Sequence, residues 1–135
     1  MAERLPRGIL DTSVVIDLDH IDPALLPREV AVTSITMAEL AAGPHATADS
    51  AERARRQDRL QRAEATFDPL PFDASAARAY GLIYAAVVAR GRKARGARAV
   101  DLLIAAVACS VGIPLCTRNP DDFVGLEELV TVLPV

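Results

Sequence analysis

The stretch Gly8-Ile9-Leu10-Asp11-Thr12-Ser13 decides the fold, because it joins a short apolar run to an acid and two helix-capping residues. The apolar run predicts a buried strand. The hydroxyl residues after it predict that a helix begins at once and continues to about residue 19. A strand followed directly by a helix is the first half of a β-α-β unit. We therefore expect Asp11 to end a buried strand at one edge of a sheet.

The same order of strand and helix continues along the chain. Short β-branched or apolar runs predict further strands, and alanine-rich or periodic segments predict helices. The strands are expected at 30–34, 67–72, 113–117 and 129–135, and the helices at 36–42, 49–65, 73–88, 102–111 and 119–126. This alternation predicts an α/β domain whose central sheet is mostly parallel, has about five strands and carries helices on both faces.

Length and composition predict one domain over residues 1–135. Hydrophobic residues make up 51% of the chain and charged residues 24%, which excludes a disordered protein. Aromatic residues are only 4%, so the core is expected to be aliphatic and rich in alanine. A formal net charge of -3 argues against a dedicated basic nucleic-acid binder.

The two cysteines and the absence of long apolar segments predict a cytoplasmic protein. Cys109 and Cys116 lie in apolar surroundings without C-x-x-C spacing, which predicts buried reduced thiols. No secretory signal opens the sequence, and the longest weakly charged run, 102–116, is broken by Gly112 and Pro114.

Acidic or amide side chains follow several of the predicted strands. Asp11 ends the first strand, and Glu39 is expected in the first turn of the helix after the second. Asp101 is expected to open the helix at 102–111, and Asn119 and Asp122 to begin the helix after the next strand. Because the carboxyl ends of parallel strands meet at one edge of a sheet, we expect these side chains to gather in one crevice.

Helix capping is another interpretation for each of these positions. Glu39, three residues after Thr36, matches a capping box, and Asp11, Asp101 and Asn119 match N-cap positions. Capping explains the residues singly but not their convergence. Carboxylates that converge repel one another unless a cation neutralises them, and oxygen donors alone favour Mg²⁺ or Mn²⁺ over Zn²⁺.

Four motifs occur along the chain in a fixed order. They are Leu10-Asp11-Thr12-Ser13 with Asp17, Ser34-Ile35-Thr36-x-Ala38-Glu39-Leu40, Ala99-x-Asp101-x-x-Ile104-Ala105-Ala106, and Thr117-Arg118-Asn119-x-x-Asp122-Phe123. In this order and spacing they resemble the PIN-domain family, and within it the VapC toxins of bacterial VapBC toxin–antitoxin pairs. The resemblance covers nearly the whole chain.

This resemblance implies a PIN-like fold and a Mg²⁺-dependent endoribonuclease, with Mn²⁺ as a possible substitute. Asp11, Glu39 and Asp101 are the implied catalytic and metal-binding acids. Either Asn119, through its amide oxygen, or Asp122 supplies the fourth catalytic position, and Asp122 is the further metal ligand. The resemblance also implies a homodimer that cuts structured RNA such as transfer or ribosomal RNA and is inhibited by a cognate VapB antitoxin.

Two kinds of residue are candidates for substrate binding. The hydroxyl groups of Thr12, Ser13 and Thr117 can orient a water or a phosphate, although capping is the favoured role of the first two. The run 90–98 carries five positive charges and no negative one and leads into the third motif. The basic side chains near the acids either contact RNA phosphates or lie at a solvated helix end, and the first interpretation is favoured. These are Arg92, Arg95, Arg98 and Arg118.

Two helices have less specific patterns. The arginines of the helix at 49–65 alternate with acids, which predicts a solvated face. On the helix at 73–88, apolar side chains recur every three or four residues and form either core or, with Leu40 and Val14, a groove for the antitoxin. These side chains are Tyr80, Ile83, Tyr84 and Val87.

The alternative to a nuclease is a catalytically silent PIN-like domain, or a metal-dependent binding module, that acts through protein partners. An adhesion-type metal module needs Asp-x-Ser-x-Ser, and the run that begins at Asp11 lacks the last serine. Such a module also leaves Glu39 and Asp101 unexplained.

Overall fold

A parallel sheet of four strands, in the order β2-β1-β3-β4, forms the centre of the molecule. It is seen in a computed structural model that describes residues 4–92 and 97–135. The strands are β1 (Arg7–Leu10), β2 (Glu29–Ala31), β3 (Leu115–Thr117) and β4 (Val132–Pro134). Ile9 of β1 lies opposite Ala31 on one side and Leu115 on the other, so β1 occupies the interior of the sheet.

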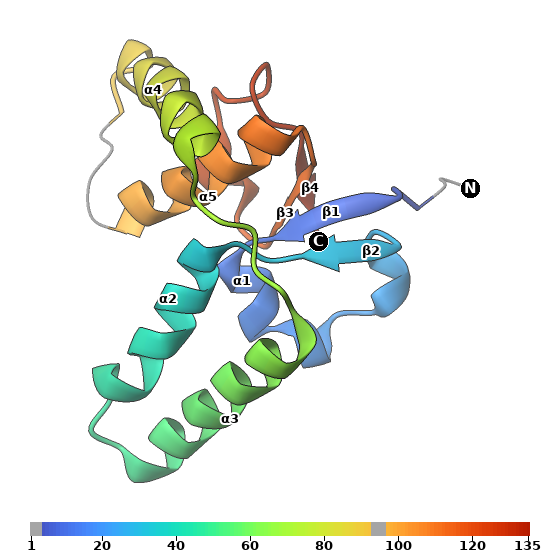
Figure 1. The fold of residues 1–135 in the computed structure, drawn as a ribbon, viewed down its shortest axis with the longest axis vertical. Coiled ribbons are helices and arrows are strands. Elements are labelled where there is room, and N and C mark those ends of the chain that lie inside the picture. The colour runs from blue at the N-terminus through green and yellow to red at the C-terminus, as the bar shows by residue number, and fades with distance from the viewer. Residues whose placement is uncertain (1–3, 93–96) are drawn as a thin grey trace.

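Helices cover both faces of the sheet, as predicted. α4 and α5 lie on one side in Figure 1, and α1, α2 and α3 lie on the other. The helices are α1 (Thr12–Ile16), α2 (Ser34–Ala42), α3 (Ser50–Thr66), α4 (Ala74–Ala89) and α5 (Ala97–Val111). Short 3-10 turns lie in the connections between elements: η1 (Leu18–His20), η2 (Pro23–Leu25), η3 (Gly43–Ala46) and η4 (Pro120–Phe123). No described helix has both the length and the apolar character needed to span a membrane.

Two apolar cores lie on opposite faces of the sheet. Successive strand residues point to opposite faces, so Ile9 and Leu115 join the core under α4 and α5, while Leu10 and Cys116 join the core against α1, α2 and α3. Burial raises the pKa of the Cys116 thiol to about 11. Both cysteines are free, as predicted, but only Cys116 is buried, and Cys109 is partly exposed.

The fifth strand that the sequence predicts at 67–72 is a single bridge. Leu70 pairs in parallel with Thr33, and its backbone N–H donates to the carbonyl of Val32 at 2.9 Å. Pro69 and Pro71 flank Leu70 and have no N–H to donate, so the pairing cannot extend.

The bounds of three predicted helices are wrong. The first helix ends at Ile16 rather than at about residue 19, and Leu18–His20 forms the separate turn η1. α5 begins at Ala97 rather than near 102, because alanine and arginine are good helix formers and extend the helix into the basic run. The helix predicted at 119–126 is the one turn η4. At the other end of α5, Gly112 adopts a φ of 68° and its N–H bonds to Ala108, which ends the helix where the sequence predicts.

The pattern on α4 divides between core and surface. Ile83 and Val87 are buried, as are Leu40 and Val14, so the core interpretation holds for these four residues. Tyr84 remains 49% exposed and contacts the ring of Tyr80 at a centroid distance of 6.2 Å.

We expect the substitution Ile83→Ala to lower the free energy of unfolding by about 3 kcal/mol, because it leaves a cavity beneath α4. Leu82 is the matched control on the same helix, since Ile83 is 0% exposed and Leu82 is 59% exposed. Leu82→Ala should change stability by less than about 0.5 kcal/mol. Urea denaturation of both variants measures the difference, and equal losses would contradict this packing.

Candidate active site

Asp11 joins the central strand to the first helix and is buried, with 4% of its surface exposed. It is the N-cap of α1: its Oδ1 accepts hydrogen bonds from the N–H of Val14 at 3.2 Å and from the hydroxyl of Ser13 at 2.6 Å. Its own N–H donates to the carbonyl of Cys116 at 3.0 Å. The capping and site interpretations therefore coexist, because one carboxylate oxygen caps the helix and the other stays available for a ligand.

Ser13 connects the ends of two strands rather than capping the helix. Its hydroxyl donates to Asp11 and accepts the backbone N–H of Arg118 at 3.1 Å. Nearby, the buried hydroxyl of Thr117 accepts the N–H of Asn119 at 3.0 Å. The bond between Ser13 and Arg118 holds the carboxyl ends of β1 and β3 side by side, and the bond to Asn119 fixes the turn after β3.

Glu39 comes from α2 and is held by Thr12. The hydroxyl of Thr12 donates to Glu39 Oε1 at 2.5 Å and shares a second hydrogen bond with the hydroxyl of Thr36 at 3.0 Å. The capping-box interpretation of Glu39 is wrong. The N-cap of α2 is Thr33, whose hydroxyl accepts the N–H of Thr36, so Glu39 lies in the second turn.

Asp101 lies within α5 and is half-buried. It is not an N-cap, because the helix begins four residues earlier. Burial is the largest cause that raises the pKa of its carboxyl. The negative charges of Asp122, Asp11 and Glu39 add to the increase, so that the pKa reaches about 6. Four carboxylates from four separate segments therefore share one electrostatic environment.

The fourth motif contributes Asp122 more directly than Asn119. Among the charged neighbours of Asp101, Asp122 has the largest effect on its pKa. The backbone carbonyl of Asp122 accepts a hydrogen bond from Arg98 at 3.1 Å, and its carboxylate lies 4.0 Å from the same guanidinium. Asn119 is exposed, and as the N-cap of η4 it forms no side-chain cap bond.

All four candidate metal ligands of this site are oxygen donors. Asp11, Glu39, Asp101 and Asp122 supply carboxylates, which suits a hard divalent cation rather than zinc. Within residues 4–92 and 97–135, no group of three or more His, Cys, Asp or Glu side chains is gathered closely enough to hold a metal ion. The four acids are thus electrostatic neighbours that do not form a closed set of metal ligands in this structure.

The arginines predicted to bind RNA also support the fold. Arg92 donates to the carbonyls of Asp121 and Val124 at 3.3 and 3.4 Å. Arg118 lies 3.5 Å from a carboxylate oxygen of Asp17 and donates to the carbonyl of Val135 at 3.3 Å. Arg95 lies outside the described residues. Contact of these side chains with RNA stays a prediction.

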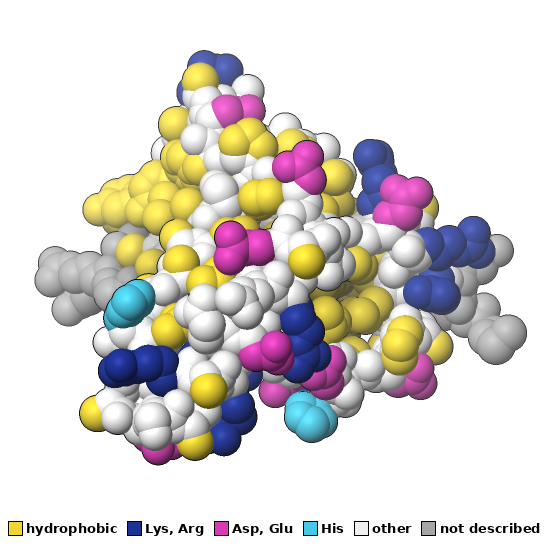
Figure 2. Space-filling view, turned by 60° about the horizontal axis from the view of Figure 1, so that its bottom comes forward, with side chains coloured by type: hydrophobic (Ala, Val, Ile, Leu, Met, Phe, Trp, Pro, Cys, Tyr) yellow, Lys and Arg dark blue, Asp and Glu magenta, His cyan; other side chains and the backbone are white. Residues whose placement is uncertain are grey.

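A hollow that the sequence does not indicate opens beside Thr12 and Glu39. It has a volume of about 310 Å³ and lies between α1, α2 and α3. Its far wall is formed by α3, whose arginines are predicted to be solvated. Charges of both signs are interspersed on the face shown in Figure 2, so the surface there has no single basic patch. The alternation of arginines and acids on α3 does not predict the hollow, because only the tertiary packing brings this helix close to the site.

The family model of the PIN domain matches residues 9–128, a span that contains all four acids. The chain belongs to the PIN-domain family, as a VapC-type member. This PIN domain is 39% identical to Ribonuclease VapC5 of Mycobacterium tuberculosis over 128 residues, which covers 93% of this chain and 91% of the relative.

Solved structures agree with this assignment. The crystal structure of VapBC-5, a member of the VapBC family of toxin–antitoxin systems from Mycobacterium tuberculosis, matches this PIN domain with a TM-score of 0.84 and 39% identity. The match covers 96% of this chain and 99% of that one. FitAcB from Neisseria gonorrhoeae matches with a TM-score of 0.70 and 26% identity, over 93% and 96% of the two chains. The predicted fold class is confirmed, with four strands in place of about five.

We expect Asp101→Asn to stabilise the metal-free protein at neutral pH. The pKa of Asp101 is raised from 3.8 to about 6, so the folded state binds more protons than the unfolded state between these values. The contribution of this group to stability is therefore lost as the pH rises from about 4 to above 6. The asparagine should recover about 1 kcal/mol above pH 6, since solvent screens a half-exposed group.

Urea unfolding in EDTA, below and above this pH window, measures the effect. Asp68→Asn is the control, because Asp68 is exposed and removed from the acids in sequence. The interpretation fails if wild type and Asp101→Asn show the same dependence of stability on pH.

Proposed function

We propose that this PIN-domain protein is the toxin of a toxin–antitoxin pair and acts as a metal-dependent endoribonuclease on structured cellular RNA. The observation that carries the proposal is the convergence of Asp11, Glu39, Asp101 and Asp122 at one edge of the sheet, with the raised pKa of Asp101 as its electrostatic signature. The 39% identity to a protein named Ribonuclease VapC5, over nearly the whole chain, supports the same activity.

The four acids suit Mg²⁺, with Mn²⁺ as a substitute, because they offer hard oxygen donors and a charge that needs neutralisation. When bound, such an ion lowers the pKa of a water molecule and offsets charge on the phosphoryl oxygens. In the proposed site Asp11, Glu39, Asp101 and Asp122 are the residues that would hold the cation. Asn119 is the alternative fourth catalytic residue, with an uncharged oxygen donor.

The chain's own residues supply the positioning. Ser13 and the N–H of Val14 orient the Asp11 carboxylate, and Thr12 orients that of Glu39. Arg98 holds the backbone of Asp122 and lies near its carboxylate. A carboxylate that is oriented in advance loses less conformational freedom when it binds a ligand, which is how such hydrogen bonds support a site.

The partners follow from the relatives. VapBC-5 is a member of a family of toxin–antitoxin systems, and this chain matches it over 96% of its length. We propose a cognate VapB-type antitoxin that inhibits the nuclease, a homodimer of this chain, and action in the cytoplasm, where structured RNA is the substrate.

Cleavage of cellular RNA should require both the divalent ion and the acids. We expect wild type to cut purified transfer or ribosomal RNA with MgCl₂ and not with EDTA. Asp11→Asn and Asp101→Asn should lower kcat by about a hundredfold or more, because each removes charge from the metal site. Asp68→Asn should cut like wild type. Equal activity in all variants, or no cleavage by wild type, would leave the catalytically silent PIN domain as the better proposal.

The RNA target can be read from the new 5′ ends that appear after brief expression. We expect one dominant cut site in a transfer or ribosomal RNA, because structured RNA is recognised through its shape and exposed loops. Asp11→Asn expressed to the same level should remove that end. Scattered ends across many transcripts would indicate a nonspecific nuclease instead.

A further inference from the structure

The turn η4, which carries Asp122, has few hydrogen bonds of its own. The N–H of Asp122 donates to the carbonyl of Asn119 at 3.1 Å, and the N–H of Val124 donates to that of Asp121 at 3.5 Å. Hydrogen bonds in a 3-10 turn have poorer geometry than those in an α-helix, so the turn depends on contacts with other segments. One such contact is Phe123, which is 2% exposed and packs into the core under α4 and α5.

Two arginines bind the backbone on both sides of Asp122. Arg92, which follows α4, donates from Nη1 to the carbonyls of Asp121 at 3.3 Å and of Val124 at 3.4 Å. Arg98, in the first turn of α5, donates to the carbonyl of Asp122 at 3.1 Å. We call Arg92 and Arg98 the arginine clamp. Three carbonyls of this short segment are thus bound by guanidinium groups from outside it.

The end of α4 fixes the place of Arg92. Gly91 adopts a φ of 70°, and its N–H donates to the carbonyl of Val88 at 2.9 Å. The N–H of Arg92 donates to the carbonyl of Val87 at 3.1 Å. These two bonds form a Schellman motif, which ends the helix in a defined geometry. Because Val87 is 4% exposed, the backbone of Arg92 is anchored to the core.

The end of α4 meets the same segment a second time. Arg90 lies so close to Gly125 that a Cβ at this position would overlap its side chain. The N–H of Gly125 in turn donates to both carboxylate oxygens of Glu127, at 3.1 and 3.0 Å. The end of α4 and the chain after η4 are therefore packed against each other.

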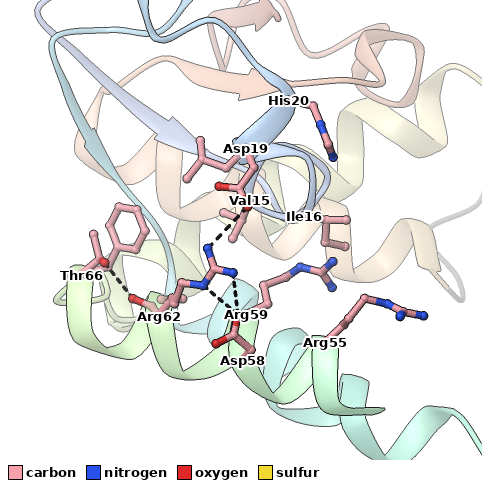
Figure 3. Close-up of a pocket in the computed structure, with 12 residues that line it drawn as sticks. Val15, Ile16, Asp19, His20, Arg55, Asp58, Arg59, Arg62 and Thr66 are labelled. Carbon is pink, nitrogen blue, oxygen red and sulfur yellow. Dashed lines mark hydrogen bonds and ion pairs between the residues drawn. The ribbon is translucent and has the colours of Figure 1, made fainter. Parts of the chain in front are cut away.

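The arginine clamp differs from the arginines of α3. There Arg62 pairs with Asp58 at 2.5 Å and with Asp19 at 3.5 Å (Figure 3), and all three side chains are exposed. Exposed pairs of this kind contribute little to stability, because both partners are mobile. Arg92 and Arg98 are half-buried and bind backbone carbonyls, so they fix the path of the chain.

We infer that Arg92 is a positioning residue, which holds the carbonyls of Asp121 and Val124 and so keeps the carboxylate of Asp122 beside the other three acids. Its consequence for cleavage rests on the proposed nuclease function. Asp122 affects the pKa of Asp101 more than any other charged neighbour does. A shift of η4 would therefore change the charge that the cation meets.

This role differs from the contact with an RNA phosphate that the sequence predicts for Arg92. A phosphate contact acts on the affinity for RNA and on its dependence on salt. A positioning role acts on the affinity of the RNA-free protein for the cation and on kcat. Positioning is favoured because both hydrogen bonds of the Arg92 side chain go to carbonyls that flank Asp122.

The test compares Arg92→Met, which removes the donors, with Arg92→Lys, which keeps a donor and the charge. Arg78→Met is the matched control, because Arg78 is an exposed arginine of α4 that donates to Ser75 of the same helix. Thermal melting in EDTA first shows that the variants fold. Hydrogen exchange in EDTA then measures the opening of residues 119–126, and electron paramagnetic resonance of free Mn²⁺ gives the Kd for the ion without RNA. KM and kcat are measured with MgCl₂.

We expect Arg92→Met to speed exchange at 119–126 about fivefold and to leave the β1 amides unchanged, since it removes two hydrogen bonds from one segment. The Kd for Mn²⁺ should rise about threefold to tenfold, with a similar fall in kcat, while KM and the salt slope of RNA binding stay unchanged. Arg92→Lys should recover most of the Mn²⁺ affinity, and Arg78→Met should behave like wild type.

Each other outcome decides between roles. If Arg92→Met exchanges like wild type at 119–126, the inference is overturned whether or not wild type cleaves RNA. If exchange is faster but wild type and Arg92→Met bind Mn²⁺ with the same Kd, Arg92 does not position Asp122. If KM rises and the salt slope falls by about 0.7 at an unchanged Kd for Mn²⁺, Arg92 is an RNA contact and the inference is overturned. If exchange is faster but wild type neither binds Mn²⁺ nor cleaves RNA, the clamp on η4 is supported and the nuclease is not.

Discussion

Mutual repulsion of carboxylates at one edge of the sheet is the constraint on which the rest of this structure depends. Asp101 shows its effect: burial is the largest cause that raises the pKa of its carboxyl, and three neighbouring negative charges add to the increase, which brings the pKa to about 6. A chain can hold such a set together only if its scaffold is otherwise stable. Here two aliphatic cores, one on each face of the sheet, supply that stability and leave the polar edge between them.

The hydroxyl groups and arginines around the edge bind the acids to the scaffold. Thr12 connects α1 to α2 through Glu39, and Ser13 connects β1 to β3 through the N–H of Arg118. Arg98 connects α5 to η4 beside Asp122. Each of these bonds joins segments far apart in the sequence, so the geometry of the site is a property of the whole fold rather than of a single loop.

Sequence reasoning reached the parts of this arrangement that have local causes. Asp11 ends a short apolar run, and the alternation of strands with helices predicts that the other acids gather near it. The predictions from sequence were wrong where contacts between distant segments determine the local structure. Thr33 rather than Thr36 caps α2, two prolines reduce the fifth strand to one bridge, and α5 extends into the basic run. The hollow beside Glu39 could not be predicted, because the charge pattern of α3 does not indicate that this helix packs near α1 and α2.

The place of β1 in the sheet has a consequence for the order of events during synthesis. Ile9 pairs with Leu115, and Ser13 bonds to Arg118, 105 residues further along the chain. Contacts between such distant residues form late, because they close a long loop. Asp11 therefore remains without its β3 neighbours until nearly the whole chain has left the ribosome. A nascent or truncated chain without β3 carries the first three motifs of the site without the site itself.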